Sequence, residues 1–173
     1  MRIIAGSRKG HKIQAPRGLD TRPTSDRVRE NVFNILGPLE GATVLDLYAG
    51  SGAMGLEALS RGATRAVFVE HDGDAVRTIE RNLDKLRLSA TILRQDAVRA
   101  LAAEAGAGRK YDLVLVDPPY TMTDYALLAR YLPLVLAEDG VIVVETAART
   151  EPELPLAQRT SRTYGSARLT LFA

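Results

Sequence analysis

Short apolar runs alternate with longer amphipathic segments along most of the chain. A helix is indicated at 74–88, where apolar residues recur on one face at helical spacing. The apolar runs predict strands at residues 43–47, 66–70, 90–94, 112–116 and 140–145. Strands that alternate with helices predict an α/β fold, in which a mostly parallel sheet is covered by helices on both faces. Several of the runs are apolar nearly throughout, as expected for strands buried on both faces.

The two ends of the chain depart from this alternation. Residues 1–15 predict a small β-hairpin with its turn at Gly10, and residues 159–173 predict an antiparallel hairpin at the sheet edge. A helix should follow Thr24 or Ser25, since either hydroxyl can cap it. We therefore expect two parts, an N-terminal extension at 1–37 and a doubly wound α/β domain at 38–173.

Composition narrows the possible chemistry. The 173 residues contain 46% hydrophobic and 25% charged residues, the balance of a globular protein. Cysteine is absent, which excludes disulfides and thiolate zinc sites. His11 and His71 are the two histidines and lie far apart, so we expect no metal site. Since no apolar run approaches the ~20 residues that span a bilayer, and no apolar leader follows Arg2, we expect a cytoplasmic protein.

Charge is distributed unevenly. Residues 1–37 contain eight Lys/Arg and three Asp/Glu, a net charge of +5, whereas the remainder carries −3. A basic segment on a mildly acidic body favours a polyanionic partner on one face. An ordinary soluble surface explains the same charge equally well.

A glycine-rich turn joins the first predicted strand to its helix. It contains G-x-G-x-x-G at Gly50, Gly52 and Gly55, and Glu70 ends the next strand. Such a turn lets a ligand approach the backbone at a helix N-terminus, and the acid can bind a ribose. This spacing fits a nicotinamide dinucleotide and S-adenosylmethionine alike.

The carboxylate of Asp46 distinguishes between these two ligands. It lies beside the turn, where it would repel a pyrophosphate but attract the cationic amino and sulfonium groups of S-adenosylmethionine. The competing interpretation is that Asp46 only accepts hydrogen bonds from loop amides. Asp96, after the third strand, could bind an adenine amino group or simply cap the following helix.

The sequence LVDPPY follows the fourth apolar run. Two prolines make a stiff corner after the strand, and that strand should end at the switch point of the sheet. There the Asp117 carboxylate and the Pro118 carbonyl could accept both N–H bonds of an exocyclic base amine, while Pro119 keeps them fixed. Tyr120 could stack on a flipped base. Alternatively, the segment is only a rigid turn with a surface tyrosine.

The segments LDLYAGSGAMGLEALSRGA, FVEHD, RQDA and VDPPY, in this order, resemble the class I S-adenosylmethionine-dependent methyltransferases that act on exocyclic amines. RIIAGSRKGHKIQAP and TRPTSDRVRENVFNIL resemble the RsmD family in particular, so the resemblance covers essentially the whole chain. It implies a Rossmann-like class I methyltransferase fold with a seven-stranded sheet, whose catalytic domain at 38–173 binds S-adenosylmethionine. It also implies methylation of the N2 amine of a guanine in bacterial 16S ribosomal RNA, within an assembled or assembling 30S subunit. The cofactor contacts that it implies are Asp46, Ala49, Gly50, Ser51, Gly52, Glu70, His71 and Asp96.

The same resemblance implies that the N-terminal hairpin helps to engage RNA. The residues expected to bind RNA are Arg2, Arg8, Lys9, Lys12 and Arg22, the first four of them at phosphates. Arg22 and Thr24 border either the cofactor or the RNA.

Three rival functions stay open at this point. Adenine-N6 methylation of RNA or DNA also uses DPPY, although 173 residues leave little room for a large target-recognition domain. A nicotinamide-dependent oxidoreductase is disfavoured by Asp46. A non-catalytic RNA-binding assembly factor is disfavoured by the intact segment Asp117–Tyr120.

Overall fold

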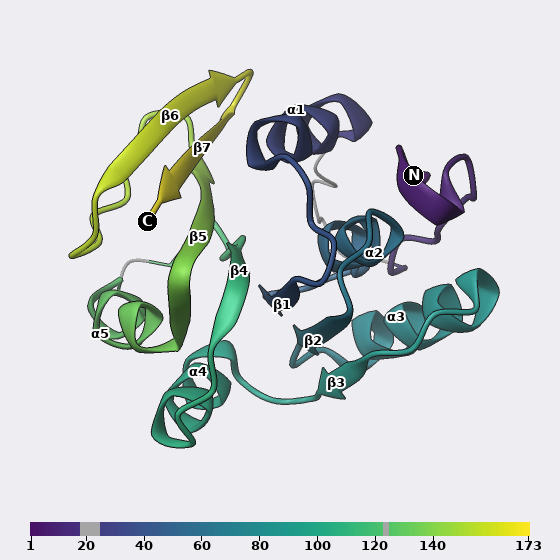
Figure 1. The fold of residues 1–173 in the computed structure, drawn as a ribbon, viewed down its shortest axis with the longest axis horizontal. Helices are drawn as coiled ribbons and strands as arrows, with labels where there is room; N and C mark the ends of the chain where they lie inside the picture. Colours follow the sequence, from purple (N-terminus) through teal and green to yellow (C-terminus); the bar gives the residue numbers. More distant parts are fainter. Residues whose placement is uncertain (18–24, 123–124) are drawn as a thin grey trace.

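The computed structural model describes residues 1–17, 25–122 and 125–173. The strands of this part form one seven-stranded sheet in the order β3-β2-β1-β4-β5-β7-β6 (Figure 1). The strands are β1 (Thr43–Leu47), β2 (Arg65–Val69), β3 (Thr91–Leu93), β4 (Tyr111–Val116), β5 (Leu136–Ala147), β6 (Gln158–Tyr164) and β7 (Ala167–Phe172). The helical elements are η1 (Gly6–Arg8), α1 (Asp26–Leu36), α2 (Ala53–Ser60), α3 (Gly73–Leu86), α4 (Ala97–Gly106) and α5 (Ala126–Val135).

The sheet is parallel from β3 to β5 and antiparallel from β5 to β6. The predicted α/β fold with an antiparallel C-terminal hairpin is therefore confirmed. β1 pairs with both β2 and β4, so the strand order reverses beside β1. Ligands of open α/β sheets bind at such a switch point, beyond the carboxyl ends of the strands.

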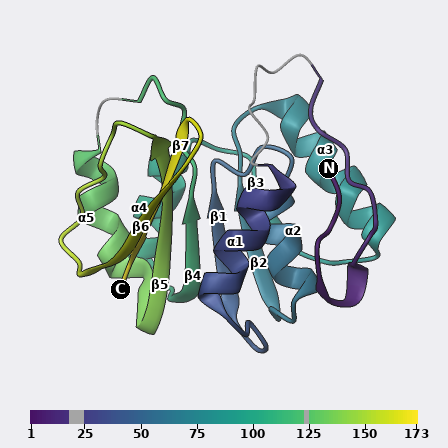
Figure 2. The same cartoon turned by 90° about the horizontal axis from the view of Figure 1, so that it is seen from above.

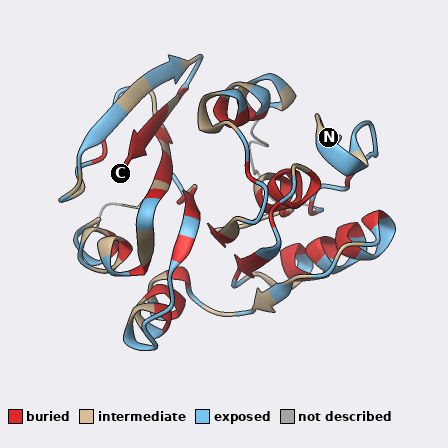
Figure 3. Ribbon diagram, viewed as in Figure 1, coloured by how far each residue is buried: buried red, intermediate tan, exposed pale blue. Residues whose placement is uncertain are grey.

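Helices cover both faces of the sheet (Figures 1 and 2). One apolar cluster joins α1, α2 and α3 to one face, and a second joins α4 and α5 to the other. The central strands are accordingly buried, whereas β6 at the edge is largely exposed (Figure 3). This explains why the runs that form β1, β2 and β4 are mostly apolar.

Local signals place several helix ends. Ser25 caps α1, because its Oγ accepts a hydrogen bond from the Val28 amide at 3.2 Å. Gly37 ends α1 with φ of 75°, a conformation that favours glycine. Asp72 caps α3 through the Ala75 amide at 2.8 Å. Thr24, the alternative cap, lies outside the described residues.

The strand lengths differ from expectation at two places. β5 spans Leu136–Ala147, longer than the predicted 140–145, and β3 is only Thr91–Leu93. The extension of β5 has a tertiary cause, because Thr146 and Ala147 pair with β7, which the local pattern does not reveal.

The N-terminal hairpin takes the form of a wide loop with one antiparallel bridge, between Arg2 and Lys12. Its end is the short helix η1, which precedes the expected turn at Gly10. The ladder does not continue, because the Ile4 and Ala5 amides donate instead to the Glu57 carboxylate of α2, at 2.9 and 3.0 Å.

This N-terminal segment is anchored to the rest of the chain. Ile3 and Ile13 are buried in the same apolar cluster as Val44 and Phe68 of the sheet. Glu57 is fully buried and also accepts a hydrogen bond from Arg61 Nε at 2.8 Å. The two parts that the sequence suggested, 1–37 and 38–173, thus share one core.

Candidate active site

Four carboxylates gather at the carboxyl ends of neighbouring strands. They are Asp46 of β1, Glu70 after β2, Asp117 after β4 and Glu145 of β5. Each follows, by two positions, a residue of the apolar cluster under α1, α2 and α3: Val44, Phe68, Leu115 and Val143. Since alternate residues of a strand share a face, all four carboxylates lie on the same face of the sheet. The switch point therefore brings four ionisable carboxyl groups together.

Asp46 is buried, and its Oδ2 accepts a hydrogen bond from the Gly55 amide at 3.0 Å. Burial and, to a smaller extent, the charge of Glu70 raise the pKa of Asp46 to about 8, against the lowering effect of that bond. A Cβ at Gly55 would lie 2.4 Å from Phe68 Cε1. The third glycine of the motif therefore serves close packing of α2 on β2. The loop-amide contact expected under the competing interpretation is present, and the cofactor contact of Asp46 stays a prediction.

Glu70 holds the glycine loop. Its Oε2 accepts from the Gly50 amide at 2.8 Å, and its Oε1 accepts from the Asp72 amide at 2.9 Å. The exposed His71 places Nδ1 3.4 Å from Oε1. Each carboxylate oxygen has a second lone pair, so hydroxyl groups can still bind Glu70.

The loop itself is tightly turned. Gly52 caps α2 in the left-handed conformation, with φ of 79°, and its amide donates to the Ala49 carbonyl at 2.8 Å. The Ser51 hydroxyl accepts from the Ala53 amide at 3.3 Å. Asp96, by contrast, is exposed and caps α4 through an amide at 3.0 Å. Capping does not prevent Asp96 from binding a base, so this role stays a prediction.

The LVDPPY corner lies beside β1, at the end of β4. Asp117 is half-buried and Pro118 is buried, whereas Pro119 is exposed and Tyr120 is 46% exposed. Burial raises the pKa of Asp117 well above its usual range, and the charges of Glu145 and Asp46 add to this effect. The Pro119 carbonyl accepts from the Met122 amide at 2.9 Å, which closes the turn. The structure thus brings Asp117 next to Asp46, as the sequence predicted.

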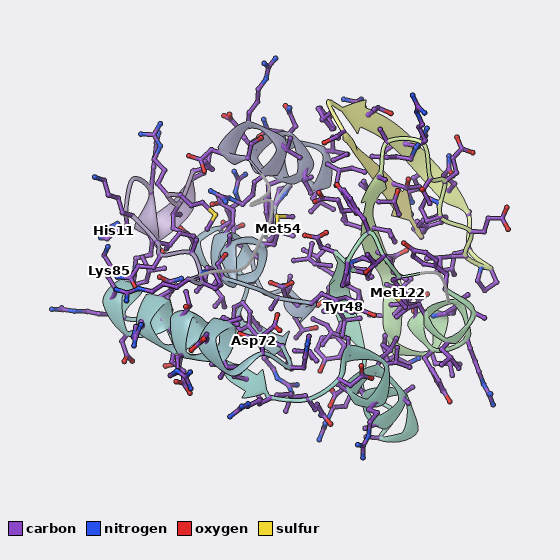
Figure 4. The ribbon with its side chains drawn as sticks, turned by 180° about the vertical axis from the view of Figure 1, so that it is seen from behind. His11, Tyr48, Met54, Asp72, Lys85 and Met122 are labelled. Carbon is purple, nitrogen blue, oxygen red and sulfur yellow. The ribbon has the colours of Figure 1, made fainter. Side chains whose placement is uncertain are left out.

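Sequence reasoning missed several residues at this site. The Tyr48 hydroxyl donates to Met122 Sδ at 3.4 Å and so ties the end of β1 to the LVDPPY corner (Figure 4). Burial raises the pKa of Tyr48 to about 12, with contributions from Asp96 and Tyr125. Glu145 ends the run VIVVE and could have been found, because the first two runs also carry an acid at or next to their last position, Asp46 and Glu70.

The basic residues expected at RNA lie in different surroundings. Arg8 donates from Nε to the Leu86 carbonyl at 2.5 Å, so it caps the end of α3. Arg2 is 3.6 Å from Asp26, and its side chain is 68% exposed. Lys9 and Lys12 are exposed. Arg22 lies outside the described residues.

Two negative findings apply to residues 1–17, 25–122 and 125–173. They contain no cluster of three His, Asp or Glu side chains suited to a metal ion. No helix among them is long and apolar enough to cross a membrane.

Comparison with known proteins assigns the family. The family model described as "Conserved hypothetical protein 95", that of RsmD, matches residues 1–173. The chain belongs to the RsmD family. The chain is 42% identical over 175 residues to the Bacillus subtilis "Putative rRNA methyltransferase YlbH". This alignment covers 95% of this chain and 94% of that protein. It is 39% identical over 153 residues to the "Ribosomal RNA small subunit methyltransferase D" of Escherichia coli, covering 84% and 74%.

Solved structures agree with this family assignment. The Escherichia coli "Putative methyltransferase yhhF" superposes with a TM-score of 0.88 at 35% identity, over 99% of this chain and 96% of that one. A more distant methyltransferase, SMU.776 in complex with SAH, matches with a TM-score of 0.70 at 18% identity, over 85% of this chain and 48% of that one. The second match concerns the fold alone, which is that of the class I methyltransferases.

Proposed function

We propose that this chain transfers a methyl group from S-adenosylmethionine to the exocyclic N2 amine of a guanine in bacterial 16S ribosomal RNA. One observation carries the proposal: Asp117 of the DPPY segment lies at the switch point of the sheet, on the same face as Asp46 and Glu70. The names of the relatives, ribosomal RNA methyltransferases, support the same class of substrate.

The side chains at the glycine loop fit S-adenosylmethionine. Asp46 and Glu70 offer carboxylate oxygens, which suit an ammonium group and ribose hydroxyls and would repel the pyrophosphate of a dinucleotide. Bound there, S-adenosylmethionine supplies a methyl group activated by the adjacent sulfonium. Its positive charge would favour the ionised forms of Asp46 and Asp117, whose pKa values are raised in the free protein.

Asp117 is suited to orient an amine. The lone pair of an exocyclic base amine is delocalised into the ring, so the amine must be turned and made pyramidal before it can attack. The Asp117 carboxylate and the Pro118 carbonyl can accept its two N–H bonds, and the turn closed at Pro119 keeps both acceptors in place. The exposed ring of Tyr120 offers a face for stacking. Once methylated, the nitrogen is acidic and releases its proton without a strong base.

The N-terminal segment offers the RNA contact. Lys9 and Lys12 are exposed on it, and His11 lies on the same side of the molecule as Lys85 of α3 (Figure 4). Phosphate contacts by such residues give affinity without reading sequence. We therefore place Lys9 and Lys12 at RNA phosphates. The RNA would belong to an assembled or assembling 30S subunit in the cytoplasm. The guanidinium of Arg8 caps the end of α3.

The test uses small subunits that lack the modification, together with methyl-labelled S-adenosylmethionine. We expect label in one nucleotide of 16S ribosomal RNA, mapped to guanine N2. Asp117→Ala should reduce transfer by orders of magnitude while cofactor affinity, measured by calorimetry, stays nearly unchanged. Asp84→Ala, which alters an exposed acid on α3, is the control.

The outcomes separate the rival functions. Label on adenine N6 would replace the proposed substrate, and no label with any subunit would favour a binding protein. Normal turnover of Asp117→Ala would show that LVDPPY is only a structural turn.

A further inference from the structure

Asn82 is a buried polar side chain in the middle of α3. It is fully buried on the helix face that also carries Ile79 and Leu83. A buried carboxamide is tolerated when its polar atoms are hydrogen-bonded. The question is therefore what the amide of Asn82 binds.

Its partners belong to two segments far apart in sequence. Nδ2 donates to the Gln14 carbonyl at 3.0 Å and to the Ser51 carbonyl at 3.1 Å. Oδ1 accepts from the Gln14 amide at 2.8 Å. Both amide hydrogens are thus used, and the arrangement requires a group with two donors and an acceptor, which aspartate would not provide.

One partner fixes the cofactor loop. The Ser51 carbonyl and the Gly52 amide belong to the same peptide unit, and Gly52 donates to the Ala49 carbonyl at 2.8 Å. That peptide is therefore held at both ends, while Glu70 holds the Gly50 amide. The direction of the loop amides depends on the Asn82 contact.

The other partner belongs to the segment that carries Lys9 and Lys12. Gln14 is exposed, but both its amide and its carbonyl pair with Asn82. Ile13, the preceding residue, is buried in the core. A shift of this segment would therefore move the side chain that orients the loop.

We propose that Asn82 is a positioning residue that couples the RNA-contacting segment to the cofactor loop, so that each ligand binds more tightly when the other is present. The inference rests on the proposed function, because it takes residues 9–14 as the RNA side and the glycine loop as the cofactor side. Coupling of this kind is reciprocal and is typically about 5- to 150-fold.

The experiment measures the affinity of the protein for unmodified small subunits by filter binding, with and without saturating S-adenosylhomocysteine. The ratio of the two dissociation constants is the coupling factor. We expect a factor of at least about 5 in the unaltered protein, and a factor near 1 in Asn82→Leu, which keeps the volume and removes the three hydrogen bonds. Thr78→Val is the matched control, since it removes a hydrogen bond to Asp74 within α3 and contacts neither segment.

A second variant covers the case in which Asn82→Leu does not fold. Gln14→Pro removes one donor from an exposed position and leaves the core side chain in place, so the factor should also fall. A factor of 1 in the unaltered protein, with methylation intact, would overturn this inference alone. An undiminished factor in a folded Asn82→Leu would do the same. Failure of the unaltered protein to methylate small subunits would instead overturn the proposed function, and this inference with it.

Discussion

Replacing Asp46 by asparagine should raise the free energy of unfolding relative to the unaltered protein, by an amount that grows as pH rises. The same replacement should weaken cofactor binding. The pKa of Asp46 is raised from 3.8 to about 8 by burial, so near neutral pH the folded protein binds a proton that the unfolded chain has lost. The stabilising contribution of this proton is complete below pH 3.8 and is lost as pH rises through about 8. Asp46→Asn keeps an oxygen for the Gly55 amide and does not titrate.

The expected magnitude follows from linkage. One extra bound proton in the folded state changes the free energy of unfolding by about 1.4 kcal/mol per pH unit. Between pH 5 and pH 7, both inside the interval between the two pKa values, the advantage of Asp46→Asn over the unaltered protein should thus grow by roughly 3 kcal/mol. Contributions from titrating groups that do not interact with Asp46 cancel in this difference, whereas Glu70 and Asp117 interact with it.

The assay is urea unfolding followed by circular dichroism at pH 5, 6 and 7 and constant ionic strength. Asp84→Asn, which replaces an exposed carboxylate on α3, is the matched control and should follow the unaltered protein. Calorimetry with S-adenosylhomocysteine should show weaker binding to Asp46→Asn, because the carboxylate for the ammonium group is gone. Stability profiles that run parallel from pH 5 to pH 7 would refute the raised pKa. Undiminished binding would show that Asp46 does not contact the cofactor.

Three further variants test other parts of the molecule. Glu70→Gln should weaken S-adenosylhomocysteine binding by about 1.5–3 kcal/mol in calorimetry, because Glu70 holds the Gly50 amide and is proposed to bind ribose hydroxyls; unchanged affinity would place the pocket elsewhere. Lys9→Gln combined with Lys12→Gln should make the slope of log affinity for RNA against log salt shallower by about 1.4–1.8, at an unchanged melting temperature. An unchanged slope would show that neither lysine contacts an RNA phosphate. Ser25→Ala should lower the free energy of unfolding by about 1 kcal/mol in urea, and equal stability would show that the cap of α1 is unimportant.

Features that depend on neighbouring residues could be predicted from the sequence. Apolar runs predicted the parallel strands, the spacing of apolar residues predicted α3, and Ser25 was one of the two residues expected to cap α1. The glycine loop and LVDPPY were also placed correctly, at the ends of β1 and β4. These signals are local, because side-chain periodicity, capping and the φ restriction of proline act within a few positions of the chain.

Only the tertiary structure decided which distant groups pair. Arg8 donates to the Leu86 carbonyl, 78 positions away, and its phosphate contact stays a prediction. Glu57 accepts from the amides of a segment more than 50 positions before it. Glu145 joins the other carboxylates because β5 pairs with β4. The contacts of Asn82 follow in the same way from the packing of α3 against two separate segments. A buried polar group takes whichever partner the packed chain brings within hydrogen-bonding distance, and that choice is absent from any local pattern.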